Sequence, residues 1–206
     1  MPLQNRVDPQ SAIKRSSARG TLMGNRGVLH NSEREVTRQF KTKAWITCQL
    51  EFKGRQRQLM SPGSYTELFF LDEVTAFAAG HRPCAECRRA RYVEFRDAWQ
   101  AANEWEGEKN VRAPELDKML HEQRMQGSAK VTWRARFKNL PHGTMLLVND
   151  EPHAVYGDRL LAWHFDGYQE ANLENLPEEV EVLTPHSVVR TFSDGFRPEF
   201  HPSILE

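Results

Sequence analysis

The sequence lacks long apolar runs, an apolar leader and a substantial set of cysteines. Its apolar stretches, such as residues 68–71 and 145–148, are far shorter than the roughly 20 residues that cross a bilayer. The first ten residues contain no apolar segment of the kind that directs secretion. Three cysteines among 206 residues are too few for a disulfide framework. We therefore expect a protein of the reducing cytoplasm, without a membrane partner.

The sequence also lacks net charge, with 28 basic and 28 acidic side chains. This balance hides an asymmetry: residues 141–206 hold 3 Lys and Arg against 12 Asp and Glu, so this part is acidic and residues 1–140 are basic. A basic part of this kind is typical of proteins that bind nucleic acid. An acidic part that packs against a basic part and neutralises it would give the same pattern.

Hydrophobic periodicity and turn residues indicate a mixed α+β fold. Alternation predicts a strand over residues 43–54, and short strands over 144–150, 153–157, 158–165 and 179–184 form a small antiparallel sheet. Helices are predicted between Asp72 as N-cap and Gly80, from Cys84 to about Glu106, and over residues 113–127. A short helix follows Thr184 as its cap. Residues 1–43 show little periodicity, and residues 16–30 fit an ordered loop, with a disordered basic arm as the alternative. The ending FHPS at 200–203 is expected to dock on the body.

Two cysteines three residues apart, Cys84 and Cys87, give the most specific local signal. Such a pair supplies half of a tetrahedral zinc site in one local structure. The exposed N–H groups at a helix start and the arginines that follow also favour thiolates. A redox pair and ordinary structural cysteines at a helix start are the alternatives. Cys48 is the one further cysteine of the chain.

The segment DEVTAFAAGHRPCAECRR at 72–89 resembles the zinc-binding N-terminal domain of the Ada methylphosphotriester repair protein, and the resemblance covers about residues 44–95. That family carries an upstream cysteine on a strand, which corresponds to Cys48. Its next cysteine, four residues later, is replaced here by Phe52. The resemblance therefore implies a zinc knuckle of Cys48, Cys84 and Cys87, with a fourth ligand that is a histidine, a water or missing. Among the histidines, His30 is the favoured candidate.

The family's methyl transfer uses the strand cysteine as acceptor, but the incomplete ligand set keeps us from extending that activity to Cys48. The whole chain also resembles a group of bacterial proteins that share the phrases MGNRG-x-LH, YTELFFLDE and GHRPCAECRR. This second resemblance brings no activity with it.

Arginines are frequent around the predicted zinc site, and their planar heads suit phosphate groups. If they gather on one surface, they form a nucleic-acid interface. The candidates are Arg19, Arg26, Arg55, Arg57, Arg82, Arg88, Arg89 and Arg91.

Asp117 and His121 lie one helical turn apart, with Glu122 beside them. A carboxylate at this spacing can orient an imidazole as a general base. A solvated polar helix face with one ion pair is the simpler interpretation.

We conclude from the sequence that this is an α+β protein in two parts. Residues 1–140 form a basic part with the Ada-like zinc subdomain and helices, and residues 141–206 form an acidic β-sheet part that packs on it. The leading hypothesis is a zinc protein that binds nucleic acid, with a role in repair, processing or regulation. The alternative is a metal-dependent hydrolase or nuclease with an open zinc position and acid–base groups at His121, Asp117 and Glu122. Whether the protein is an enzyme stays open at this point.

Overall fold

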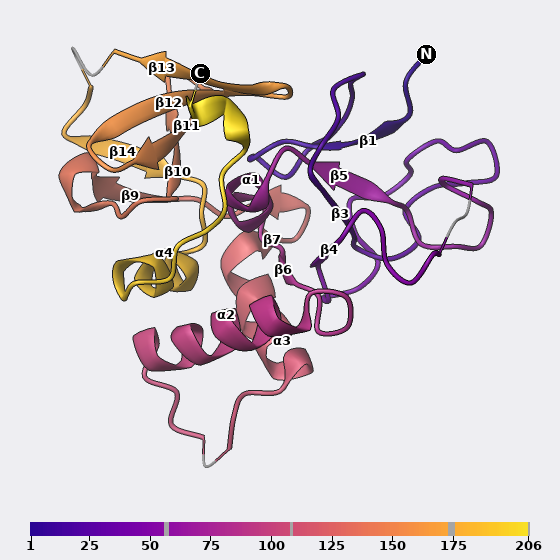
Figure 1. Ribbon diagram of the computed structural model, residues 1–206, viewed down its shortest axis with the longest axis horizontal. Coiled ribbons are helices and arrows are strands. Elements are labelled where there is room, and N and C mark those ends of the chain that lie inside the picture. The colour runs from indigo at the N-terminus through magenta and orange to yellow at the C-terminus, as the bar shows by residue number, and fades with distance from the viewer. Residues whose placement is uncertain (56–57, 108, 173–175, 206) are drawn as a thin grey trace.

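The computed structural model describes residues 1–55, 58–107, 109–172 and 176–205. Within these ranges the chain forms two six-stranded sheets, one two-stranded hairpin and four α-helices, which confirms the α+β prediction. The two sheets lie on either side of the central helix α1 (Glu73–Ala78), and the other helices form a layer beside them (Figure 1). No described helix combines the length and the apolar character that crossing a membrane requires.

The N-terminal sheet has the strand order β2-β1-β5-β3-β4-β6 and mixes parallel and antiparallel pairs. Its strands are β1 (Gln4–Val7), β2 (Ile13–Arg15), β3 (Leu22–Asn25), β4 (Ile46–Cys48), β5 (Leu68–Phe70) and β6 (Arg82–Pro83). The predicted strand over 43–54 is thus only the short β4. The first 43 residues contribute three strands that the periodicity did not reveal, and the loop expected over residues 16–30 contains β3.

The C-terminal sheet is antiparallel throughout, with the order β13-β12-β11-β10-β14-β9. Its strands are β9 (Trp133–Arg136), β10 (Met145–Val148), β11 (Glu151–Tyr156), β12 (Arg159–His164), β13 (Gly167–Ala171) and β14 (Glu179–Val182). The four predicted strands are confirmed as β10, β11, β12 and β14. The sheet also contains β13 and β9, and β9 precedes the predicted division at residue 140.

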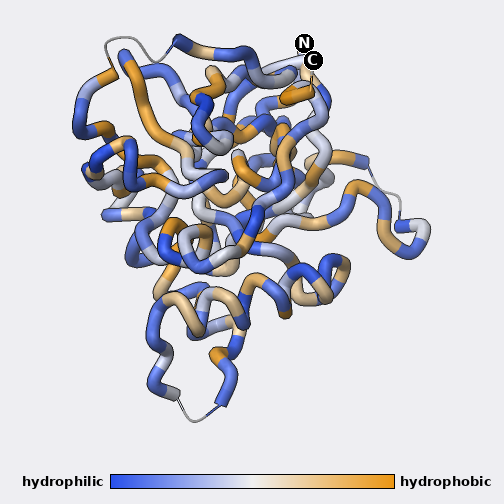
Figure 2. Tube along the Cα trace, turned by 60° about the vertical axis from the view of Figure 1, so that its left-hand side comes forward, coloured by the Kyte–Doolittle hydropathy of each residue, from blue (hydrophilic) through white to orange (hydrophobic). Residues whose placement is uncertain are grey.

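Three helices pack around one aromatic core. They are α2 (Arg89–Ala102), α3 (Ala113–Arg124) and α4 (His186–Ser193). The residues Tyr92, Phe95 and Trp99 form an apolar stripe along α2 and are buried in this core together with Phe77 and Phe192. The connection between α2 and α3 projects from the body and is mostly hydrophilic (Figure 2).

Three predicted helix ends differ from the structure. The helix expected from Cys84 begins at Arg89, and residues 85–88 form a turn. The helix over 113–127 ends at Arg124, where the hairpin of β7 (Met125–Gln126) and β8 (Ala129–Lys130) begins. Thr184 does not cap α4, because its hydroxyl accepts a hydrogen bond from the backbone N–H of Met145 at 2.9 Å.

Helix α1 joins the two parts of the chain through the two carboxylates at its start. As predicted, Asp72 is its N-cap and accepts hydrogen bonds from Thr75 N and Thr75 Oγ1 at 2.8 and 2.7 Å. Its other oxygen accepts from Tyr168 Oη at 2.9 Å and from the backbone N–H of His201 at 3.0 Å. The C-terminal segment therefore docks on the body as expected, and it ends in the 3₁₀ helix η2 (Pro202–Leu205) beside β13.

Candidate metal centre

Strand pairing brings Cys48 beside the Cys84–Cys87 turn. Cys48 is the last residue of β4, and β4 pairs in parallel with β6, which ends immediately before Cys84. The backbone N–H of Cys84 continues this pairing by donating to the carbonyl of Thr47 at 2.8 Å. The chain then turns through residues 85–88 and returns Cys87 to the same point. Two segments that lie 36 residues apart in sequence thus meet at one place.

The three thiol groups form a compact cluster. The Sγ atoms of Cys48, Cys84 and Cys87 all lie within 4.8 Å of one another. Cys48 and Cys84 are each 8% exposed, and Cys87 is half-buried. Such a set of convergent sulfur atoms is what a thiolate-bound metal requires.

The local hydrogen bonds concentrate negative charge on one of the three sulfur atoms. A hydrogen bond from the Cys48 thiol and the backbone N–H groups of Glu86 and Cys87 lower the pKa of Cys84 to about 5 against the opposing effect of burial. The Glu86 N–H lies 3.4 Å from this sulfur atom. The hydrogen bond to Cys84 raises the pKa of Cys48, and burial raises the pKa of Cys87. The turn therefore presents a thiolate to a cation even before the other two thiols lose their protons.

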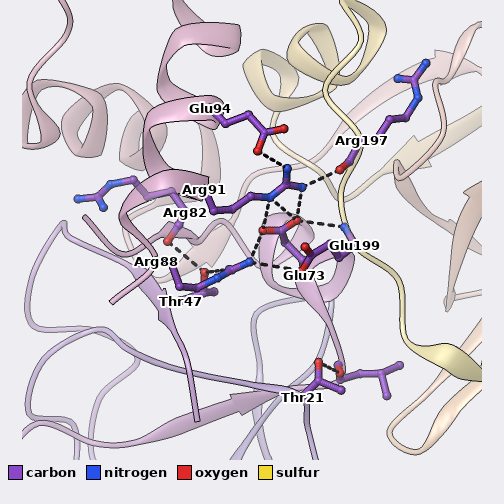
Figure 3. A network of polar contacts seen from close by, with 10 residues as sticks. Thr21, Thr47, Glu73, Arg82, Arg88, Arg91, Glu94, Arg197 and Glu199 are labelled. Carbon is purple, nitrogen blue, oxygen red and sulfur yellow. Dashed lines mark hydrogen bonds and ion pairs between the residues drawn. The ribbon is translucent and has the colours of Figure 1, made fainter. Parts of the chain in front are cut away.

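A buried ion-pair network holds this turn in place (Figure 3). Arg88, the residue after Cys87, donates from Nη1 to Thr47 Oγ1 at 2.9 Å and from Nη2 to Glu73 Oε1 at 2.7 Å. Glu73 is 1% exposed and also accepts from Arg91 Nη2 at 2.6 Å. The network thus connects Thr47, which precedes Cys48, with Arg88, which follows Cys87. It stabilises the relative positions of β4, α1 and the start of α2.

The donor set fits a soft or borderline metal ion. Three thiolates are ligands typical of zinc, copper(I) and iron–sulfur clusters, whereas carboxylate-poor sites of this kind do not suit magnesium or calcium. Zinc prefers four ligands, and in catalytic sites the fourth position is left to water or substrate. The residues present therefore fit a metal ion held by Cys48, Cys84 and Cys87, with one position left for another ligand.

A pocket of about 580 Å³ opens directly above the cluster. All three cysteines line it. Other lining residues belong to β5 and to the segment that leads into it, including Tyr65, Glu67 and Phe69. A molecule in this pocket would therefore contact the thiol groups from the side that the protein leaves open.

The structure does not bring His30 to the cysteine cluster. Its ring nitrogens lie 2.6 Å from Thr66 Oγ1 and 3.2 Å from the Ser61 carbonyl oxygen. His81, adjacent to the turn in sequence, is buried instead against Trp45 and Phe70, with Nε2 accepting from Arg26. Phe52, which replaces the fourth cysteine of the Ada pattern, lines the pocket. The prediction of His30 as fourth ligand is therefore not supported by its position.

The arginines of the predicted nucleic-acid interface differ in how far they are buried. Arg26 is 0% exposed and packs over the Trp45 ring at 3.9 Å. Arg82 is buried in an ion pair with Asp117, and Arg88 is buried in an ion pair with Glu73.

The other arginines of the predicted interface are less buried. Arg91 is half-buried and also pairs with Glu73, whereas the side chains of Arg19, Arg55 and Arg89 are exposed. Arg57 lies outside the described residues. Because three of the main candidates neutralise buried carboxylates or stack on a core ring, they are not available to phosphate groups, and nucleic-acid binding stays a prediction.

The predicted acid–base residues Asp117, His121 and Glu122 lie in three different environments. Both oxygens of Asp117 accept hydrogen bonds from Arg82, from Nε and Nη2, at 2.8 Å each. His121 packs edge-on against Phe40, and its Nδ1 lies 3.4 Å from Arg124 Nη2. Glu122 is exposed. None of the three predicted catalytic residues is among the residues that line the pocket, so the geometry does not connect them with the cysteines.

The sequence did not single out three residues that line the pocket, Leu59, Glu67 and Phe69. Glu67 is 1% exposed, and its Oε2 accepts a hydrogen bond from the backbone N–H of Met60 at 2.8 Å. An acidic residue inside the apolar phrase YTELFF is a usable signal, because a buried carboxylate needs a specific reason to be there. Leu59 and Phe69 carried no comparable signal, since isolated apolar residues occur on many loops.

In comparisons with known proteins, no family model matches the chain, and no curated protein or solved structure gives a significant match.

Proposed function

We propose that this protein is a zinc-binding protein in which Cys48, Cys84 and Cys87 hold the metal and leave its fourth position open to the pocket. The observation that carries the proposal is that the three Sγ atoms lie within 4.8 Å of one another, on cysteines that line a cavity of about 580 Å³. The resemblance of residues 44–95 to the Ada zinc domain supports the same ligands. The choice of zinc over other thiophilic ions rests on this resemblance, since three thiolates also suit copper(I).

An open position favours a centre that accepts a ligand or substrate over a purely structural one. Structural zinc sites use four protein ligands, whereas sites with three protein ligands and an accessible fourth position are typical of catalysis. When bound, zinc at such a position supplies Lewis-acid chemistry. The chain's own contribution is to lower the pKa of Cys84 in the metal-free centre, through the hydrogen bond from Cys48 and then the N–H groups of the turn, and to surround the open side with the pocket walls.

The test is the metal content of freshly purified, reduced protein, measured by elemental mass spectrometry. We expect about one zinc ion per chain in the wild type and a loss of most of it in Cys84→Ser. The matched control is His30→Gln, which should retain zinc because His30 binds Thr66 and Ser61 instead. Wild-type protein without metal, or a folded Cys84→Ser variant with full zinc content, would refute the proposed centre.

The open position has its own test in cobalt-substituted protein. Cobalt(II) bound by three thiolates and an exchangeable ligand should change its visible absorption when imidazole or cyanide is added. A spectrum that stays unchanged at saturating concentrations of both would indicate a closed four-ligand site. That result would assign the metal a structural role.

A further inference from the structure

The lining of the pocket combines polar and apolar side chains. Besides the three cysteines, the lining contains the polar side chains of Asn25, Gln49, Arg55, Glu67 and Glu86. The apolar parts of the walls come from four different segments of the N-terminal part. These apolar residues are Met23, Ile46, Leu50, Phe52, Leu59 and Phe69.

Two of these wall residues are exposed to an unusual degree for their type. Leu50 is 50% exposed and Leu59 is 37% exposed. Among the described residues, the other large apolar side chains with comparable exposure are Met1 and Leu205, which lie at the chain ends. Exposed apolar side chains that gather at one cavity mark a surface that binds an apolar partner or ligand.

The rim of the pocket is not arranged for an anion. Arg55 is the one Lys or Arg among the described lining residues, and its Nη2 forms an ion pair with Glu86 Oε1 at 2.7 Å. This pair connects the segment after β4 with the Cys84–Cys87 turn. A phosphate group would have to displace Glu86 from Arg55 to reach a cation, because this arginine is already neutralised.

The cavity volume sets the size of a suitable ligand. A dry protein cavity of about 150 Å³ is large enough for benzene. The pocket, at about 580 Å³, therefore has room for a molecule several times larger than one ring. This volume is in the range of small-molecule sites and too small for a folded partner.

We propose that this pocket binds a small organic thiol with an apolar body, whose sulfur atom takes the open position of the metal held by Cys48, Cys84 and Cys87. The inference rests on the proposed metal centre. A soft thiolate site favours a soft fourth donor, and the apolar walls favour a hydrophobic body over a hydrophilic one. On binding, the ligand's S–H bond breaks, its proton passes to solvent, and its sulfur replaces the exchangeable ligand at the metal.

The experiment compares two thiols of similar acidity on the full-length, cobalt-substituted protein. Benzyl mercaptan carries an apolar ring, and 2-mercaptoethanol carries a hydroxyl group in its place. Binding is followed through the cobalt absorption bands, at thiol concentrations that leave the bound cobalt with the protein. We expect benzyl mercaptan to bind at least about tenfold more tightly, since burial of roughly 60 Å² of additional apolar surface at about 25 cal/mol per Å² corresponds to that factor.

The variant that tests the walls is Leu50→Ser combined with Leu59→Ser. Both side chains are exposed, so the substitutions leave the core intact. They should reduce the preference for benzyl mercaptan to about threefold or less, while the affinity for 2-mercaptoethanol stays unchanged. Leu205→Ser is the matched control, because Leu205 is 82% exposed and does not line the pocket.

The outcomes separate this inference from the metal centre itself. Cobalt bound to the protein together with equal affinities for the two thiols would overturn the apolar-thiol pocket and leave the metal centre intact. A preference that survives the double leucine substitution would also overturn it. Protein that binds neither cobalt nor zinc would refute the metal centre and this inference together.

Discussion

Replacing Glu73 by glutamine should lower the free energy of unfolding by about 3 kcal/mol, because the change removes the charge that compensates the buried Arg88 and the half-buried Arg91. Glu73 is 1% exposed, and its oxygens accept from Arg88 Nη2 at 2.7 Å, from Arg91 Nη2 at 2.6 Å and from the backbone N–H of Glu199 at 3.0 Å. Glutamine keeps the size of the side chain. It offers one acceptor in place of two, and it turns an NH₂ group toward donors.

The expected loss of stability depends on the ion pairs that Arg88 and Arg91 retain in the variant. Loss of one partner of a buried ion pair typically costs about 3–5 kcal/mol. Arg91 keeps its ion pair with Glu94 at 2.8 Å, whereas the remaining acid near Arg88 is the largely exposed Glu199 at 3.6 Å. We therefore take the lower end of the range. Because single domains are stable by only about 5–15 kcal/mol, a loss of this size is readily measured.

The assay is urea unfolding followed by tryptophan fluorescence, with zinc and with a chelator. The control is Glu94→Gln, which removes a carboxylate from the same network at a side chain that is 58% exposed, and should cost less than about 1 kcal/mol. A loss below about 1 kcal/mol for Glu73→Gln would refute the view that this carboxylate holds the cysteine turn in place.

Two further predictions concern buried charges away from the pocket. Asp117→Asn should lower the free energy of unfolding by about 3 kcal/mol without changing zinc content, because Asp117 compensates the buried Arg82; a variant of unchanged urea stability would contradict this structural role. Burial lowers the pKa of Lys130 to about 7. The charged groups that act on it are Arg26, Asp8 and Arg124. Between that pH and the ordinary lysine pKa of about 10.4, the unfolded chain binds more protons than the folded one, so the free energy of unfolding should rise with pH, by at most about 1.4 kcal/mol per pH unit. Urea unfolding at about pH 7 and about pH 9 checks this, and Lys130→Met should show a smaller rise than the wild type.

Some elements of the fold follow from local sequence alone. Helix α1 begins after Asp72 because this side chain caps it, and it ends before Gly80, whose φ of +86° suits a residue without a Cβ atom. The C-terminal strands follow from short apolar segments separated by turn residues, and β14 also alternates between exposed and buried positions. In both cases the determining contacts lie within a few residues of one another.

Other elements depended on contacts far apart in the chain. Strand β1 pairs with β5 through Arg6 and Phe69, and neither short segment shows a periodicity that reveals the pair. Helix α2 begins at Arg89 and not at Cys84, because residues 85–88 form a turn that brings Cys87 back to Cys48 and Cys84. The local propensity for helix is overridden there by contacts with a segment far away in the sequence.

The sequence by itself determined the chemical elements of the site: two cysteines three residues apart, and a third on a strand that the Ada resemblance grouped with them. Only the tertiary structure decided that residues 85–88 form a turn, that His30 lies elsewhere, and that Asp117 neutralises Arg82. The physical reason is that spacing along the chain fixes which groups share a turn or a helix face, whereas the partner of a buried charge or thiol is set by sheet register and packing. Those arise from segments tens of residues apart, and no local pattern records them.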